Sequence, residues 1–161
     1  MRKTLRIITE PNPILHEKSL SVTAIDDEVR SFMDDMLVAM YENKGIGLAA
    51  VQVGILKRII VIDVEQEGSD GFKMPLFMVN AEIVKKSKEY ASFPEGCLSV
   101  PNFSAEVMRP ADITVRFINY NGLTEEIEVK NSLLSVCIQH EIDHTNGILF
   151  TDHVYDIANH R

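Results

Sequence analysis

Two histidines four residues apart, His140 and His144, and the glutamate that follows the first form the pattern with the clearest chemistry in this chain. Residues four apart in a helix lie one turn apart on the same face, so both imidazoles can bind one cation. Glu141 lies about 100° around the helix from His140, where it can act on a water molecule as a general base. The His-Glu-x-x-His pattern therefore predicts a hydrolytic metal site, which requires a third protein ligand.

The residues after His144 do not supply that ligand in a known arrangement. Gly147 fits the extended pattern His-Glu-x-x-His-x-x-Gly-x-x-His, but Phe150 stands where its third histidine is required. No glutamate follows Glu141, so a site with a downstream glutamate ligand is excluded as well. The remaining downstream candidates are weaker: Asp152, His153, Asp156 and His160.

Cys97 is a better candidate, upstream of the histidines. It lies within residues 93–101, where flanking glycine and proline residues favour a shaped loop or a strand bend. A thiolate binds zinc or ferrous iron and would complete a Cys-His-His set. Two alternatives stay open. Cys137 could be a fourth ligand of a closed structural zinc site, in which Glu141 would have no role. The same core could also belong to a metallopeptidase.

Two helices are predicted on either side of a strand region. Residues 1–25 are expected to form an extended arm, and a first helix to run from the acidic residues 26–28 to 43–45, where Gly45 favours a stop. A last helix is predicted from residue 131 or 132, either of which can cap it, to Gly147. This helix carries both histidines and is apolar nearly all round, which indicates burial.

The predicted strands are 58–64, one or two within 76–93, and a hairpin of 113–117 and 126–129 around Asn121-Gly122, with a polar turn at 65–71. This order of elements predicts an α+β fold. We expect mostly antiparallel β-sheets packed around a central buried helix that carries His-Glu-x-x-His. The length favours a single domain of residues 1–161.

The composition of the chain argues against several classes of function. The chain has 161 residues, of which 45% are apolar and 25% charged, as is usual for globular proteins in water. Its net charge of −8 argues against direct DNA binding, and we interpret the basic cluster at residues 85–88 as a solvated strand face. No apolar run is long enough for a membrane span or a signal peptide. We therefore expect a cytoplasmic protein, or the mature form of an organellar one.

Three segments resemble the peptide deformylase family: residues 45–52 (GIGLAAVQ), 95–99 (EGCLS), and 139–144 (QHEIDH) followed by Gly147. The resemblance implies a compact α+β hydrolase that removes the N-formyl group from formyl-methionyl termini of newly synthesised polypeptides and releases formate. The first segment also matches a Gly-x-Gly-x-x-Ala dinucleotide pattern, but a predicted helix precedes it where that motif requires a strand.

The resemblance also implies the roles of individual residues. One divalent metal ion would be held by Cys97, His140 and His144, with ferrous iron as the usual ion and zinc, nickel or cobalt as substitutes. Glu141 would be the general acid and base. Gln52 and the backbone N–H of Leu98 would stabilise the oxyanion.

The substrate methionine is expected in an apolar pocket beside the metal. Candidate substrate-binding residues are Gly45, Ile46, Gly47, Phe93, Gly96, Leu133 and Cys137. The implied partners are N-formylmethionyl peptides or nascent chains, with transient ribosome contact and no membrane. Ser104 stands where many relatives carry an arginine that touches the substrate backbone, which predicts weaker peptide binding, and Arg109 is no obvious substitute. A long C-terminal helix, which many bacterial relatives have, is not predicted.

Overall fold

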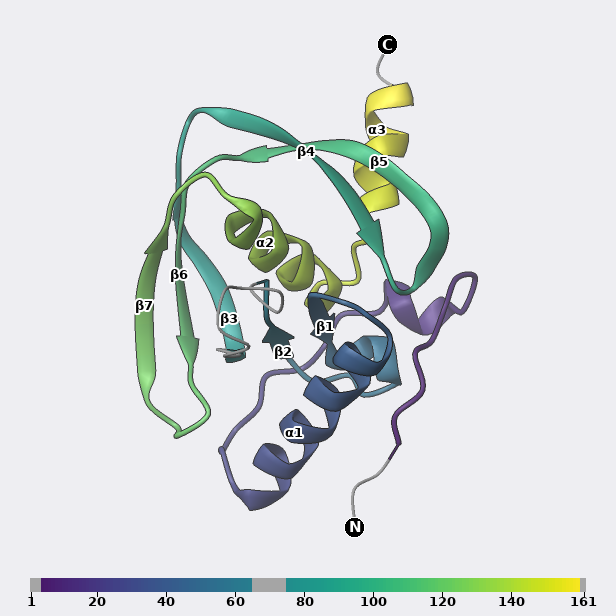
Figure 1. The fold of residues 1–161 in the computed structure, drawn as a ribbon. Coiled ribbons are helices and arrows are strands. Elements are labelled where there is room, and N and C mark those ends of the chain that lie inside the picture. Colours follow the sequence, from purple (N-terminus) through teal and green to yellow (C-terminus); the bar gives the residue numbers. More distant parts are fainter. Residues whose placement is uncertain (1–3, 65–74, 160–161) are drawn as a thin grey trace.

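The computed structural model describes residues 4–64 and 75–159 of the chain (Figure 1). In chain order the elements are η1 (Pro13–His16), α1 (Asp27–Glu42), β1 (Gly47–Ala49), η2 (Ala50–Val53), β2 (Ile59–Ile62), β3 (Leu76–Lys86), β4 (Tyr90–Cys97), β5 (Val100–Pro110), β6 (Ile113–Ile118), β7 (Thr124–Val129), α2 (Leu133–Thr145) and α3 (Phe150–Asn159). The two η elements are short 3-10 helices. None of the helices in these residues has the length and apolar character needed to cross a membrane.

Two antiparallel sheets surround helix α2. Five strands pair in the order β1-β2-β3-β6-β7, and β4 pairs separately with β5. Figure 1 shows α2 near the middle of the molecule, with β3, β6 and β7 on one side and the long β4–β5 hairpin arching over it. This arrangement confirms the predicted α+β fold with a central buried helix. It also explains why α2 is apolar nearly all round.

Strand β2 is buried on both faces. Ile60 and Ile62 pack in one cluster with apolar residues of α2, whereas Ile59 and Val61 pack in a second cluster with the buried methionines of α1. Successive side chains of a strand point to opposite faces, so each face of β2 is covered by one helix. This double coverage explains the unbroken apolar run Ile59–Ile62 within the strand predicted at 58–64.

Both predicted helices are present with nearly the predicted ends. Asp26 caps α1 by accepting a hydrogen bond from the Val29 N–H at 2.9 Å, and Ser132 caps α2 by accepting one from Ser135 at 3.2 Å. Gly147 follows α2 in the left-handed conformation, with φ 75°. After α1, however, the left-handed residue is Lys44, with φ 59°, and not Gly45 as expected.

The strands agree with the sequence in part. The 113–129 hairpin is confirmed, although β7 already begins at residue 124 and the turn spans 119–123. Residues 76–93 contain β3 and the start of β4, which belong to different sheets. The predicted turn at 65–71 lies outside the described residues. Five elements were not predicted: η1, β1, η2, β5 and α3. The predicted extended arm contains η1 and forms a single parallel bridge from Leu20 to Lys57.

Candidate metal centre and active site

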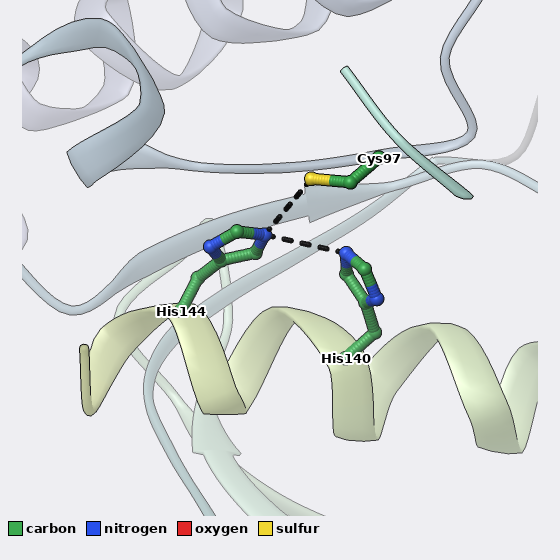
Figure 2. A group of neighbouring side chains, drawn as sticks. All are labelled: Cys97, His140 and His144. Carbon is green, nitrogen blue, oxygen red and sulfur yellow. Dashed lines mark hydrogen bonds between the residues drawn. The ribbon is translucent and has the colours of Figure 1, made fainter. Parts of the chain in front are cut away.

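The three predicted metal ligands converge on one point from two elements (Figure 2). Cys97 ends β4, and His140 and His144 lie one turn apart on α2. The Nε2 atom of His144 lies 3.3 Å from the Sγ atom of Cys97 and 3.2 Å from the Nε2 atom of His140. All three ligand atoms lie within 4.8 Å of one another, and within residues 4–64 and 75–159 they form the only such group.

These distances suit a divalent metal ion. Bonds of about 2.3 Å to sulfur and about 2.0 Å to nitrogen place the ligand atoms of a tetrahedral site about 3.3–3.6 Å apart. The two distances found here are close to that range. One thiolate and two imidazoles leave a fourth position for water or substrate, which is typical of catalytic sites. The side chains present therefore fit a catalytic metal ion.

The pKa values of the two histidines are shifted in opposite directions. Burial, and then the charge of His140, lower the pKa of His144 well below its ordinary value, so its ring is neutral. Burial also acts to lower the pKa of His140, but the Cys97 sulfur and the Glu95 carboxylate outweigh burial and raise this pKa to about 10. Because a ligand must be the neutral imidazole, metal binding at His140 displaces a proton.

A chain of charged groups orients His140. Its Nδ1–H donates to the Oε1 atom of Glu95 at 2.9 Å, which leaves Nε2 for the metal. Arg109 on β5 donates to both oxygens of Glu95, at 2.6 and 3.0 Å, and to Asp143 at 2.9 Å. Asp143 also pairs with His153 of α3 at 2.8 Å. Carboxylates behind metal-bound histidines fix the tautomer and the ring orientation, so this network prepares His140 for its ligand role.

The sequence alone predicts no role for Glu95 or for Arg109. A usable signal was present for Glu95, which lies two residues before Cys97 and therefore on the same face of a strand. A metal-bound histidine usually donates to a carboxylate, so an acidic residue at this position was a candidate partner. Arg109 gave no comparable signal, because its partner depends on how β4 and β5 pair.

We predict that acid destabilises the metal-free protein through this network. Burial alone would raise the pKa values of Glu95 and Asp143, but hydrogen bonds from His140, His153 and Arg109 outweigh it and hold both below their ordinary values. Both carboxylates therefore stabilise the fold above their unfolded pKa values, and this stabilisation is lost as the pH falls through the folded ones. Urea titrations are expected to show a free energy of unfolding that falls below about pH 4.5. A value that stays constant down to about pH 3 would contradict the prediction.

Glu141 faces the cavity beside the ligands. It is 3% exposed, and its Oε1 atom has no hydrogen-bond partner among the described residues. Burial raises its pKa to about 7, although the charge of His140 opposes this rise. A carboxyl group with such a pKa can take up and release a proton near neutral pH. Gly47 leaves the space for it, because a Cβ atom there would lie 2.7 Å from the Glu141 Oε2.

Gln52 lies in η2, next to the Cys97 sulfur atom. Its Oε1 atom accepts from the Ala49 N–H at 2.9 Å, and its Nε2 atom lies 3.1 Å from the Ser99 Oγ and 3.5 Å from the Cys97 Sγ. The N-terminal arm supports both segments: the Ser99 hydroxyl donates to the Ile8 carbonyl, and the Ile8 N–H donates to the Gln52 carbonyl, each at 2.7 Å. The amide is therefore fixed with its N–H groups beside the ligands.

A cavity of about 590 Å³ opens next to this group. Glu141, Gln52 and Leu98 line it, together with six of the candidate substrate-binding residues: Gly45, Ile46, Gly47, Gly96, Leu133 and Cys137. Phe93 is not among the lining residues. It precedes Cys97 by four residues, or about 13 Å along a strand. The apolar lining includes Val136 and Phe103 instead.

The alternative ligands are engaged elsewhere. The Cys137 thiol donates to the Ile46 carbonyl at 3.8 Å, outside the ligand group, and burial raises its pKa well above the ordinary value. The group of converging ligand atoms contains Cys97, His140 and His144 but not Cys137, which argues against a closed four-ligand site. Downstream, Asp152 accepts from the Leu149 N–H and His153 pairs with Asp143. The side chain of Asp156 and all of His160 lie outside the described residues.

The Cys137→Ser variant is expected to keep one metal ion per chain, because its sulfur is not a ligand. The metal content after reconstitution and desalting, measured by elemental analysis, checks this expectation. Cys97→Ser is the matched control, since it replaces the thiolate ligand and should lose most of the metal. An equal loss in both variants would favour the closed site.

Comparisons with known proteins agree with this geometry. A family model described as polypeptide deformylase matches residues 4–160. The peptide deformylase of Rhizobium meliloti (strain 1021) is 46% identical over 148 residues, which cover 92% of this chain and 83% of that protein. The crystal structure of a probable peptide deformylase from Synechococcus phage S-SSM7 matches with a TM-score of 0.88 at 43% identity, covering 93% of this chain and 99% of that one.

A second solved structure, the peptide deformylase of Ehrlichia chaffeensis in complex with actinonin, matches with a TM-score of 0.87 at 40% identity, covering 94% of this chain and 88% of that one. The matched regions include both β4, with the cysteine ligand, and α2, with the histidine ligands. The family model and these relatives cover more than nine-tenths of the sequence, and the chain therefore belongs to the polypeptide deformylase family.

Proposed function

We propose that this protein is a metal-dependent peptide deformylase. It hydrolyses the N-formyl group of formyl-methionyl termini on newly synthesised polypeptides and releases formate. The observation that carries the proposal is the group of Cys97, His140 and His144 beside an open cavity, in a chain of this family. Glu141, which also lines the cavity, supplies the acid-base group that amide hydrolysis needs.

Each side chain at the site has a separate role in the proposed reaction. When bound, a divalent metal ion supplies Lewis-acid chemistry, which makes water nucleophilic at neutral pH and polarises the formyl carbonyl. Glu141 takes the proton of the attacking water and returns it to the leaving amine. The Gln52 amide and the Leu98 N–H donate to the oxygen that becomes negative. The apolar walls, including Ile46 and Leu133, receive the methionine side chain.

We infer that ferrous iron is the resident ion and that zinc, nickel or cobalt can occupy the same ligands. One thiolate and two imidazoles form a donor set that all four ions accept. Removal of the ion by a chelator is expected to abolish formate release, and anaerobic addition of Fe²⁺ to restore it. Restoration by Mg²⁺ alone would contradict this ligand assignment, since Mg²⁺ prefers oxygen ligands.

The formate-release assay tests the proposed function directly. The iron-loaded protein is incubated anaerobically with formyl-Met-Ala-Ser and, in parallel, with Met-Ala-Ser. Formate release with intact peptide bonds is expected from the first peptide, and no reaction from the second. Cleavage of the unformylated peptide without formate release would instead support a metallopeptidase.

The Gln52→Ala variant is expected to lower kcat about 100- to 1000-fold, by analogy with the loss of other oxyanion donors. The metal content should stay at one ion per chain, because Gln52 is not a ligand. Steady-state kinetics with formyl-Met-Ala-Ser measure the effect, which should appear in kcat more than in KM. A kcat within about threefold of the unchanged protein would exclude the oxyanion role.

We also propose that the protein acts in the cytoplasm of a bacterium, or in the corresponding compartment of an organelle, and contacts the ribosome transiently. Bacterial relatives and a substrate that arises on nascent chains support this proposal. Cosedimentation with ribosomes at low salt, lost at high salt, is the expected behaviour.

A further inference from the structure

The cavity contains one cationic side chain that the proposed reaction does not use. Lys44 is the only lysine or arginine among the lining residues, and it is exposed. The carboxylates that line the cavity, Glu95 and Glu141, are 5% and 3% exposed and lie at its buried end. Lys44 takes part in none of the ion pairs among the described residues. Its charge is therefore available to a ligand in the cavity.

The chain length between Lys44 and the reacting end shows which part of a substrate it can meet. Gly47 is buried, and a Cβ atom there would lie 2.7 Å from the Glu141 Oε2 and 2.8 Å from the Cys137 Sγ, so Gly47 lies at the buried end. Lys44 precedes Gly47 by three residues, which span at most about 11 Å. An extended peptide covers a similar distance in three residues. With the formyl group at the metal ligands and the methionine next, Lys44 lies level with the second or third residue of the substrate.

The backbone at Lys44 is fixed in an unusual conformation. Its φ is 59°, a left-handed value that suits glycine or asparagine better than lysine. The Lys44 N–H donates to the Tyr41 carbonyl at 3.0 Å, and the Gly45 N–H donates to the Met40 carbonyl at 2.9 Å. A lysine that is kept in a disfavoured conformation at a cavity mouth suggests a use for its charge. The same geometry makes asparagine a suitable neutral replacement.

We propose that Lys44 determines substrate specificity by favouring formylated peptides with a carboxylate at the second or third residue. The inference rests on the deformylase function proposed above. The net charge of −8 acts in the opposite direction, because the field of the whole molecule repels acidic peptides. A preference for acidic residues would therefore come from the local lysine. The lysine ammonium is a point charge on a flexible side chain, so it can reach a carboxylate at either the second or the third residue of the peptide. The preference is therefore graded and not absolute.

The experiment compares matched peptides on the nickel-loaded protein. The substrates are formyl-Met-Ala-Asp-amide, formyl-Met-Asp-Ala-amide and formyl-Met-Ala-Asn-amide, with formyl-Met-Ala-Asn as a free acid to test the chain-terminal carboxylate separately. The protein, Lys44→Asn, Lys44→Arg and Lys44→Glu are assayed for kcat/KM by formate release at low and high salt. Thermal unfolding of each variant shows whether it is folded.

At low salt, we expect the better of the two Asp peptides to exceed the Asn amide about three- to tenfold in kcat/KM, and the ratio to shrink at high salt. Lys44→Arg should keep the ratio, Lys44→Asn should bring it to about one, and Lys44→Glu should invert it. Equal rates on Asp and Asn peptides with the unchanged lysine, or an unchanged ratio in Lys44→Asn, would overturn the inference. Formate release from none of the peptides would instead overturn the proposed function, and the inference with it.

Discussion

The Glu141→Gln variant is expected to lose formate release while it keeps its metal ion. Glutamine fills the same space but cannot carry a proton from water to the leaving amine, and such transfers contribute about 100- to 10,000-fold to a rate. We therefore expect kcat/KM to fall by this factor. The three metal ligands are untouched, so elemental analysis should still find one ion per chain.

The stability of this variant provides a second measurement. Burial of the Glu141 carboxyl raises its pKa, and its Oε1 lacks a partner among the described residues, so its charged form opposes folding. The melting temperature of Glu141→Gln should therefore be equal to or above that of the original protein. Glu42→Gln, an exposed residue at the end of α1, is the matched control and should change neither quantity. Activity of Glu141→Gln within tenfold of the original would show that Glu141 does not transfer the proton.

The Arg109→Met variant is expected to cause the largest loss of stability. Arg109 is 5% exposed and binds two carboxylates, so its removal takes the shared cation from the buried Glu95 and the half-buried Asp143. Breaking a buried pair in this way costs about 3–5 kcal/mol. For a protein of this size the melting temperature should fall by about 10–15 °C. Metal affinity should also fall about 10- to 100-fold, because Glu95 orients His140.

Arg116→Met is the matched control for this prediction. Arg116 also pairs with two carboxylates, those of Glu82 and Glu126, but its side chain is 49% exposed. Exposed pairs contribute at most about 1 kcal/mol, so this variant should melt within a few degrees of the original protein. Calorimetry and chelator competition measure both variants. Similar melting temperatures for Arg109→Met and Arg116→Met would show that the buried network does not support the fold.

The sequence was sufficient to locate the ligands, since local geometry determines their arrangement. His140, Glu141 and His144 are neighbours on one helix, and any helix brings them together. Cys97 was found because ligand chemistry left few candidates and a resemblance to a family supported it. The buried helix and the hairpin around Asn121-Gly122 were also predicted, because both depend on patterns within about 15 residues of sequence.

The features that were missed depend on contacts between distant segments. Arg109 meets Glu95 only because β4 and β5 pair in one register, with Glu95 opposite Ala105. Strand β5 was not predicted because residues 101–104 are all exposed and show no alternation of burial. The short α3 was overlooked because tertiary contacts hold it, including the stacking of Phe150 on Phe103 with centroids 5.9 Å apart.

The N-terminal arm links the turnover of this protein to Ile8 and Glu10, far from the metal ligands in sequence. The Ile8 N–H and carbonyl form hydrogen bonds with the Gln52 carbonyl and the Ser99 hydroxyl, respectively. The Glu10 N–H donates to the Ser99 carbonyl at 2.8 Å. A deletion or a purification tag that displaces these residues would misalign the Gln52 amide and leave the cysteine and both histidines in place. A preparation of that kind would contain its full share of metal and still work slowly. The quality of a preparation is therefore better judged by its rate than by its metal content.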